Sequence, residues 1–392
     1  MVYADALAPD QWQPKPFREF VLKVHSRCDL SCDYCYVYKM ADGSWRSQPR
    51  RMAQETVDQT AARIAEHARK YSLDRIGVVL HGGEPLLAGL ERIEYIVKTI
   101  RSSTDAHVKF DMQTNALRLD MNYLELFDRL DIHLSVSLDG GEDAHDRNRR
   151  RADGQGSHEA VARSLELLTS GPFWRLFNGL VATIDLRNDP VEAYQHLLRF
   201  RPPQVDFLLP HGNWSAPPPG RTTGSPETPY GDWLVRVFDR WCSAPKRETR
   251  VRLFSEIMKT LLGRASTTEL IGLSPIATVV IETDGSIEQS DILKSAFPGA
   301  AKTGLHVSRD SFDAALALPG FVNRQLGSRA LSRQCQSCSI LATCGGGLYA
   351  HRYHEDNGFV NPSVYCLDLF RIITHVRETM QSDLAAQGSQ RP

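Results

Sequence analysis

The stretch Cys28-Asp29-Leu30-Ser31-Cys32-Asp33-Tyr34-Cys35 decides how the rest of this 392-residue sequence is interpreted. It directly follows the apolar run 20–24, so we expect it on a loop at the carboxyl end of a strand, where α/β sheets and barrels bind ligands. Three thiols at Cys-x3-Cys-x2-Cys spacing indicate a metal centre. A zinc knuckle would need His25 or a distant residue as its fourth ligand. An iron–sulfur cluster, normally held by four thiolates, would instead keep one iron open to a further ligand.

Apolar runs alternate with amphipathic stretches from this point to about residue 210. Strands are predicted at residues 20–24, 76–80, 108–112, 132–138, 179–184 and 205–209, and helices at 53–71, 90–102, 122–130, 157–170 and 191–200. Several strands are continuous apolar runs, which is typical of parallel strands buried on both faces. Six βα repeats predict an α/β fold with a parallel sheet, either doubly wound or bent into an incomplete barrel, because eight strands are not visible.

The amino-acid composition changes after the last of these strands. Residues 202–231 are rich in proline and glycine and indicate a linker or long ordered loop. Helices are predicted at 232–242 and 252–262, and a strand at 277–283 precedes an Asp284-Gly285 hairpin signal. The predicted regions are an N-terminal extension (1–16), a barrel (17–231), a helical bridge (232–272), a smaller C-terminal domain (273–384) and a flexible tail (385–392).

Composition excludes several classes of protein. There are 46 basic and 47 acidic side chains, so no global charge favours nucleic acid or an acidic membrane as a partner. No apolar run approaches the roughly 20 residues needed to span a bilayer. Residues 1–16 lack the basic and apolar regions of a signal peptide, which predicts a cytoplasmic protein. In a reducing cytosol, eight cysteines indicate metal ligation or catalysis.

Three further motifs lie at strand ends. His81-Gly82-Gly83-Glu84-Pro85 follows the second strand, Gln113-Thr114-Asn115 the third, and Ser135-Val136-Ser137-Leu138-Asp139-Gly140 the fourth, with Arg149 nearby. A Gly-Gly-Glu segment alone is an ordinary turn. Together with the cysteine loop, however, the motifs resemble the radical S-adenosylmethionine (SAM) superfamily.

That resemblance implies a partial (β/α)6 barrel and a [4Fe–4S] cluster on Cys28, Cys32 and Cys35, with SAM chelating the fourth iron. Reductive cleavage of SAM would then give a 5′-deoxyadenosyl radical that abstracts a substrate hydrogen. Glu84 matches the motif that holds the SAM amino group, while Ser137 and Arg149 match contacts to its carboxylate. The full set of implied cofactor-binding residues is Tyr34, Gly82, Gly83, Glu84, Pro85, Gln113, Asn115, Ser137, Asp139 and Arg149.

A second group of thiols comprises Cys335, Cys338, Cys344 and Cys366. Structural zinc or a fully ligated iron–sulfur cluster both suit four thiols. The pattern Cys-x2-Cys-x5-Cys-Gly-Gly-Gly with a later cysteine resembles the SPASM domain of peptide-modifying radical SAM enzymes, which implies an auxiliary [4Fe–4S] cluster.

Ser290 and Leu348 stand where full SPASM domains carry cysteines, so we expect two clusters in total and not three. This departure weakens a sulfatase-maturase interpretation. Cys242, next to Trp241 on an amphipathic helix, is expected to be a small buried hydrophobe. His351 and His354 are expected to be structural or surface residues.

Four stretches, residues 16–27, 36–38, 79–87 and 206–211, are similar to the FxsB-type branch of SPASM peptide maturases, and the resemblance runs over nearly the whole chain. That resemblance implies a radical SAM oxidoreductase that modifies a ribosomally made precursor peptide, forming a cyclophane between an aromatic ring carbon and a nearby β-carbon. Asp291 and Glu282 are the candidate proton acceptors, and flavodoxin or ferredoxin is the expected reducing partner. We expect the peptide to dock between the barrel and the SPASM domain, helped by residues 202–231. The alternatives are thioether formation, epimerisation, dehydrogenation, a sulfatase-maturase-like reaction, or a non-catalytic zinc-binding scaffold.

Overall fold

The computed structural model describes residues 12–388, in which ten strands form one continuous sheet in the order β10-β9-β8-β1-β2-β3-β4-β5-β6-β7. The neighbours from β8 through β1 to β7 are parallel, whereas β9 pairs antiparallel with both β8 and β10. The strands are β1 (Glu19–His25), β2 (Arg75–Gly82), β3 (His107–Thr114), β4 (Ile132–Ser137), β5 (Phe177–Thr183), β6 (Gln204–Leu208), β7 (Arg250–Val251), β8 (Thr278–Ile281), β9 (Ser286–Glu288) and β10 (Lys302–His306).

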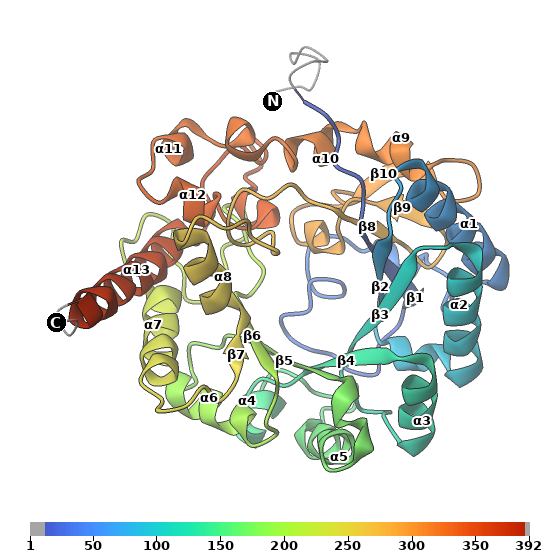
Figure 1. Ribbon diagram of the computed structural model, residues 1–392, viewed down its shortest axis with the longest axis horizontal. Coiled ribbons are helices and arrows are strands. Elements are labelled where there is room, and N and C mark those ends of the chain that lie inside the picture. Colours follow the sequence, from blue (N-terminus) through green and yellow to red (C-terminus); the bar gives the residue numbers. More distant parts are fainter. Residues whose placement is uncertain (1–11, 389–392) are drawn as a thin grey trace.

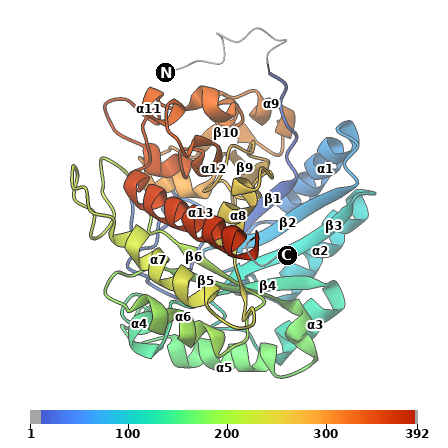
Figure 2. The same ribbon diagram turned by 60° about the vertical axis from the view of Figure 1, so that its left-hand side comes forward.

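Helices cover the outside of this curved sheet, and the C-terminal elements lie at one end of it (Figure 1). The longest helix, α13, packs beside α7 (Figure 2). The α-helices are α1 (Gln54–Lys70), α2 (Leu90–Ser103), α3 (Met121–Leu130), α4 (Glu142–Asp146), α5 (His158–Thr169), α6 (Pro190–Leu198), α7 (Pro229–Cys242), α8 (Arg252–Leu261), α9 (Phe312–Leu316), α10 (Pro319–Asn323), α11 (Arg333–Gln336), α12 (Leu341–Cys344) and α13 (Cys366–Gly388). The predicted α/β partial barrel with a smaller C-terminal part is therefore confirmed.

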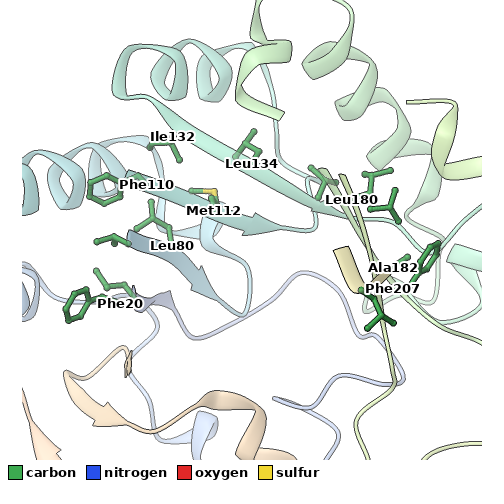
Figure 3. Close-up of a cluster of buried hydrophobic side chains, with 14 of the residues drawn as sticks. Phe20, Leu80, Phe110, Met112, Ile132, Leu134, Leu180, Ala182 and Phe207 are labelled. Atoms are coloured by element: carbon green, nitrogen blue, oxygen red, sulfur yellow. The ribbon is translucent and has the colours of Figure 1, made fainter. Parts of the chain in front are cut away.

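The core lies between the strands and the outer helices. In-register neighbours form rows across the sheet, such as Leu22, Leu80, Met112 and Leu134, all fully or almost fully buried (Figure 3). The burial pattern of β2 and β4 alternates strictly, because their other face lines a hollow inside the barrel. The prediction that continuous apolar runs are buried on both faces is therefore wrong for β2, whereas β4 alternates apolar and polar residues in its sequence as well.

The C-terminal residues do not form a separate sheet. The predicted strand 277–283 is β8, which pairs in parallel with β1, so the barrel sheet runs on past residue 273. Helix α13 continues to Gly388 and so includes residues 385–388 of the predicted flexible tail, while 389–392 lie outside the described residues. Among the described residues, no helix is long and apolar enough to cross a membrane.

Candidate active site and cysteine centres

A cavity of about 430 Å³ opens inside the barrel, within the size range of small-molecule sites. Most of the sequence-predicted cofactor residues line it, because motifs that follow parallel strands meet at one edge of the sheet. The predicted residues that it brings together are Cys28, Cys32, Tyr34, Cys35, Gly82, Gly83, Glu84, Gln113, Asn115, Ser137 and Arg149. Pro85 and Asp139 are buried just behind this lining.

Glu84 is held rigidly in the cavity wall. Its carboxylate accepts hydrogen bonds from the main-chain N–H groups of Leu86 (3.0 Å) and Asn115 (2.8 Å) and from the Thr114 hydroxyl (2.6 Å). Burial nevertheless raises the pKa of Glu84 to about 7. No cationic side chain of the described residues contacts this carboxylate, so an ammonium group of a ligand would complete it.

The glycine beside Glu84 is required by close packing. A Cβ atom on Gly83 would lie 1.9 Å from the Tyr38 hydroxyl oxygen and 2.4 Å from the Arg27 carbonyl oxygen. Only glycine therefore permits this approach of β2 to the cysteine loop.

Arg149 is fixed on the opposite side by a polar network. Its guanidinium donates to the Tyr34 hydroxyl (2.9 Å), which in turn donates to Asp139. The Asp139 carboxylate also accepts from the Thr183 N–H group (2.9 Å). The Nε of Arg149 is buried without a partner in the described structure, and Gln113 donates to Ser137 (3.0 Å) nearby. This wall is polar and cationic, which suits a carboxylate.

The first cysteine loop lies against both walls. Asn115 Nδ2 is 3.7 Å from Cys28 Sγ, and the Leu30 N–H group donates to the same sulfur (3.4 Å). Burial raises the pKa of the Cys28 and Cys32 thiols, and Arg149 opposes this shift at Cys32. Metal binding requires the thiolate form. Three free thiols around one cavity therefore fit a cluster whose open iron faces the ligand pocket.

The four cysteines of the second group line one small pocket at the N-terminal end of α13. The turn after Cys344 is held by Arg352, which donates to the carbonyl oxygens of Gly345 (2.9 Å), Gly346 (3.0 Å) and Gly347 (2.6 Å). These glycines have φ between 64° and 81°, and a Cβ on Gly345 would lie 1.8 Å from the Gly272 carbonyl oxygen.

Four free thiols around one small pocket fit a fully ligated cluster. No three His, Cys, Asp or Glu side chains within residues 12–388 form a single-ion site. A [4Fe–4S] cluster is larger, with one thiolate on each iron, so its ligands need not converge on a point.

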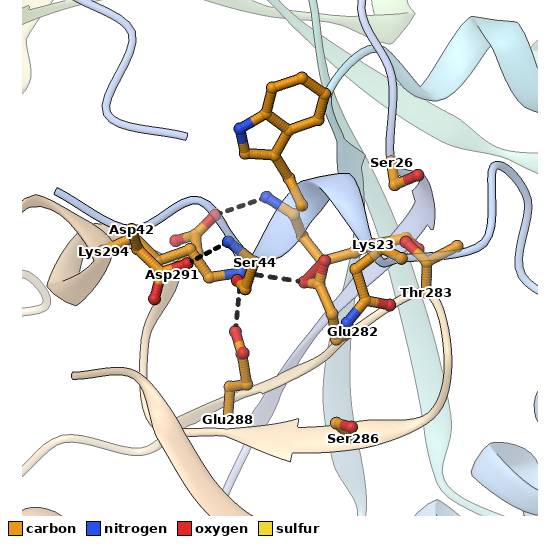
Figure 4. A network of polar contacts seen from close by, with 12 residues as sticks. Lys23, Ser26, Asp42, Ser44, Glu282, Thr283, Ser286, Glu288, Asp291 and Lys294 are labelled. Carbon is orange, nitrogen blue, oxygen red and sulfur yellow. Dashed lines mark hydrogen bonds and ion pairs between the residues drawn. The ribbon is translucent and has the colours of Figure 1, made fainter. Parts of the chain in front are cut away.

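Neither candidate proton acceptor lines the cavity. Glu282 is 2% exposed and lies 3.3 Å from Lys294, which also pairs with Glu288 (2.9 Å; Figure 4). It does not reach the cavity, so the structure does not support it as a proton acceptor. Asp291 is 2.7 Å from Lys23 and accepts a hydrogen bond from the cavity-lining Tyr36 (2.9 Å). Asp291 is therefore one hydrogen bond away from the cavity.

Sequence reasoning did not assign several polar residues of the cavity wall, among them Tyr36, His81 and His211. Tyr36 directly follows the cysteine loop and His81 begins a quoted motif, but no spacing rule distinguishes them. His351 is buried and is therefore not a surface residue; neither of its ring nitrogens is hydrogen-bonded in the described structure, and its ring lies 5.5 Å from that of His211. Cys242 is exposed at the end of α7, so the prediction of a buried side chain is wrong.

Comparison with known proteins agrees with this geometry. The cysteine-type anaerobic sulfatase-maturating enzyme of Clostridium perfringens (strain 13 / Type A) is 23% identical over 90% of this chain and 94% of its own. The serine-type enzyme of Klebsiella aerogenes is 25% identical over 88% and 82%. The solved structure of native anSMEcpe with bound AdoMet and Cp18Cys peptide shares the fold with a TM-score of 0.78, at 18% identity over 94% of this chain and 98% of that one. Streptococcus suis SuiB bound to precursor peptide SuiA has a TM-score of 0.58, at 13% identity over 90% and 76%.

A family model adds the assignment of the barrel. The model described as the Radical SAM superfamily matches residues 22–197, which contain the first cysteine loop, Glu84 and Arg149. Residues 22–197 therefore match the radical SAM superfamily, whose enzymes use a [4Fe–4S] cluster together with SAM.

Proposed function

We propose that this radical SAM enzyme modifies a ribosomally made precursor peptide by joining an aromatic ring carbon to the β-carbon of a nearby residue. One observation carries the proposal. Beyond the residues that suit SAM, the cavity wall includes the apolar residues Leu180, Val181, Leu208, Leu209 and Pro210, together with the ion pair of Asp206 and Arg252. An aromatic side chain is the substrate group that such a wall favours.

The cofactors are assigned to specific residues in this proposal. Cys28, Cys32 and Cys35 hold one [4Fe–4S] cluster, Glu84 takes the amino group of SAM, and Ser137 and Arg149 take its carboxylate. When bound, the cluster and SAM together supply the radical that removes a hydrogen atom from the substrate β-carbon. The buried network of Tyr34, Asp139 and Arg149 keeps the carboxylate site oriented before SAM arrives.

Ring closure also requires the loss of one electron and one proton. We assign the electron to an auxiliary cluster on Cys335, Cys338, Cys344 and Cys366, and the proton to Asp291 through Tyr36. Burial opposes ionisation of Asp291, but the Lys23 ammonium, with a smaller contribution from Lys294, holds the pKa of this carboxyl far below its usual value, so it is ionised and open to a strongly acidic ring intermediate. A flavodoxin or ferredoxin is the proposed source of the electron that starts the reaction.

A sulfatase-maturase-like reaction is the second candidate. It is favoured by the relatives, which carry that name and align over most of both chains. The solved structures of anSMEcpe and SuiB with peptides support a peptide substrate for either candidate. Ser290 and Leu348, in place of two expected cysteines, favour the cross-linking reaction.

The test is incubation of the anaerobically reconstituted enzyme, SAM and dithionite with a peptide panel in which every member lacks cysteine and serine but carries one aromatic residue. Cross-linking predicts a mass loss of two hydrogens, with fragmentation that locates a bond between the ring and a β-carbon. Products only from matched cysteine- or serine-containing peptides would favour the second candidate. A protein that holds zinc and forms no 5′-deoxyadenosine would refute both.

A further inference from the structure

Tyr36 and His81 lie on the cavity wall, and their buried neighbours fix the direction of their hydrogen bonds. Both side chains line the cavity and both approach Asp291, which is 8% exposed. A tyrosine hydroxyl and a neutral imidazole can each donate or accept. Their neighbours decide which of these each presents to a ligand.

Tyr36 is fixed as an acceptor. Its hydroxyl oxygen is 2.9 Å from Asp291 Oδ2. The same carboxylate oxygen forms an ion pair with Lys23 Nζ at 2.7 Å. Because an ionised carboxylate can only accept, the single Tyr36 proton points at Asp291. The lone pairs of the hydroxyl are left for the cavity. The His211 ring packs against the Tyr36 ring at 4.8 Å and a 75° angle, which restrains the orientation of the phenol.

His81 is fixed as a donor. Its Nδ1 receives the Gly82 N–H group (2.8 Å) and lies 3.4 Å from Lys23 Nζ. Both of these groups can only donate, so Nδ1 carries no proton and the ring proton sits on Nε2. Burial, with the neighbouring charge of Lys23, lowers the pKa of His81 to about 4, while Asp291 opposes the shift, so the ring is neutral near pH 7.

The His81 Nε2–H group faces the cavity. No described residue accepts a hydrogen bond from Nε2, and the side chain keeps 24% of its surface exposed on the wall that it lines. The charges behind the wall are paired, since Lys23 and Asp291 are in contact. The wall therefore offers one acceptor and one donor without a free charge.

We propose that Tyr36 and His81 bind the amide backbone of the substrate at one extended residue, with its N–H on the Tyr36 oxygen and its C=O on His81 Nε2–H. An amide is neutral and presents one donor and one acceptor, which matches this wall better than a carboxylate or an ammonium group. The inference rests on the proposed peptide substrate. It adds that Lys23, Asp291 and Gly82 are positioning groups that set the polarity of the amide site.

The first test needs no substrate. Histidine ¹⁵N NMR of the anaerobic holoenzyme with SAM reports the tautomer of His81, assigned by the signal that His81→Gln removes. We expect a neutral ring with its proton on Nε2 between pH 6 and pH 8. A proton on Nδ1, or a charged ring at pH 7, would overturn the amide site.

The second test uses acetyl-Trp-Gly-Asn-methylamide and four ester analogues, each of which replaces one of its four backbone N–H groups by oxygen. Binding to the holoenzyme with SAM is measured by calorimetry. We expect one ester to bind the wild type about tenfold more weakly than the amide peptide, but to bind Tyr36→Phe as well as the amide does. His81→Leu should weaken every probe about tenfold, and His81→Gln, which keeps an N–H donor, should restore most of that loss.

Matched controls are Tyr95→Phe, which removes a tyrosine–aspartate contact on the outer surface, and His107→Leu at the exposed start of β3. Neither should change binding of any probe. Equal losses for all esters in the wild type and Tyr36→Phe would overturn the amide site while leaving the peptide substrate intact. If the expected tautomer is found but no probe binds the wild type, the proposed peptide substrate fails, and the amide site with it.

Discussion

Glu84 combines complete burial with three hydrogen-bond donors and no fixed cation, which makes its charge sensitive to pH. Its pKa of about 7 means that the carboxyl is largely neutral at pH 6 and ionised at pH 7.5. An ammonium ligand prefers the ionised form. SAM should therefore bind several-fold more tightly as the pH rises from 6 to 7.5. Its amino group stays largely protonated over this range, because the pKa of a typical α-amino group is about 7.7–8.0.

Equilibrium binding of SAM across this window, measured by calorimetry on the reconstituted enzyme, provides the check. Glu84→Gln keeps the size and the hydrogen-bonding side chain but cannot ionise. It should bind SAM more weakly at pH 7.5 and lose the pH dependence. A wild type whose affinity is flat or falls over this range would contradict the role of Glu84.

Lys294 supports a second residue-level prediction, about stability. It is 1% exposed and lies between Glu282 and Glu288. Burial raises the pKa of Glu288 to about 7. Lys294→Met leaves two buried carboxylates without a cation and should cost about 3–5 kcal/mol at pH 8. The loss should be smaller at pH 6, because Glu288, with its raised pKa, is then largely protonated and needs no cationic partner.

Urea unfolding at the two pH values measures this difference. Lys70→Met removes an exposed ion pair with Asp313 and serves as the control, expected to cost at most about 1 kcal/mol. A pH-independent loss in Lys294→Met would show that packing, and not charge, explains the effect.

The residues of the candidate site could be predicted from the sequence where they follow predicted strands. Residues 28–35, Glu84 and Asn115 follow apolar runs directly, and parallel strands bring such positions to one edge. Side-chain direction was not predictable, because distant partners set it. Asp291 is buried by its pairing with Lys23, 268 positions away in sequence, and Glu282 by its pairing with Lys294.

At the level of elements, the contact between α7 and α13 shows how the C-terminal residues stabilise the barrel. Thr228 precedes α7 but makes no capping bond with its side chain. The Asp368 side chain, from α13, caps α7 instead, because it accepts hydrogen bonds from the N–H groups of Tyr230 and Gly231, each at 2.9 Å. The Arg221 guanidinium lies beside the same carboxylate. Asp368→Ala should therefore destabilise the protein by about 2–4 kcal/mol, since two donors and a buried cation lose their acceptor.

Thermal unfolding of Asp368→Ala and Asp232→Ala makes the comparison direct. Asp232 lies on α7 in an exposed ion pair with Arg371, so its loss should cost under about 1 kcal/mol. Equal effects of the two changes would argue against the cap. This cap could not be predicted from the sequence, because the capping residue is supplied by a helix more than a hundred positions away. The long helices and strands could be predicted, because their periodicity is local.

At the scale of the whole molecule, the two cysteine groups make separable predictions because each lines its own pocket. Anaerobic reconstitution should give about eight irons per chain, four for each cluster. The triple change of Cys28, Cys32 and Cys35 to alanine should reduce this to about four and abolish SAM cleavage. Cys344→Ala should also lower the iron content, yet 5′-deoxyadenosine should still form while the cross-linked product does not. Cys242→Ser, at the exposed end of α7, should change neither quantity. Full cross-linking by Cys344→Ala would contradict the assignment of the second cysteine group as the electron acceptor, because the ring intermediate would then lose its electron without an intact cluster there.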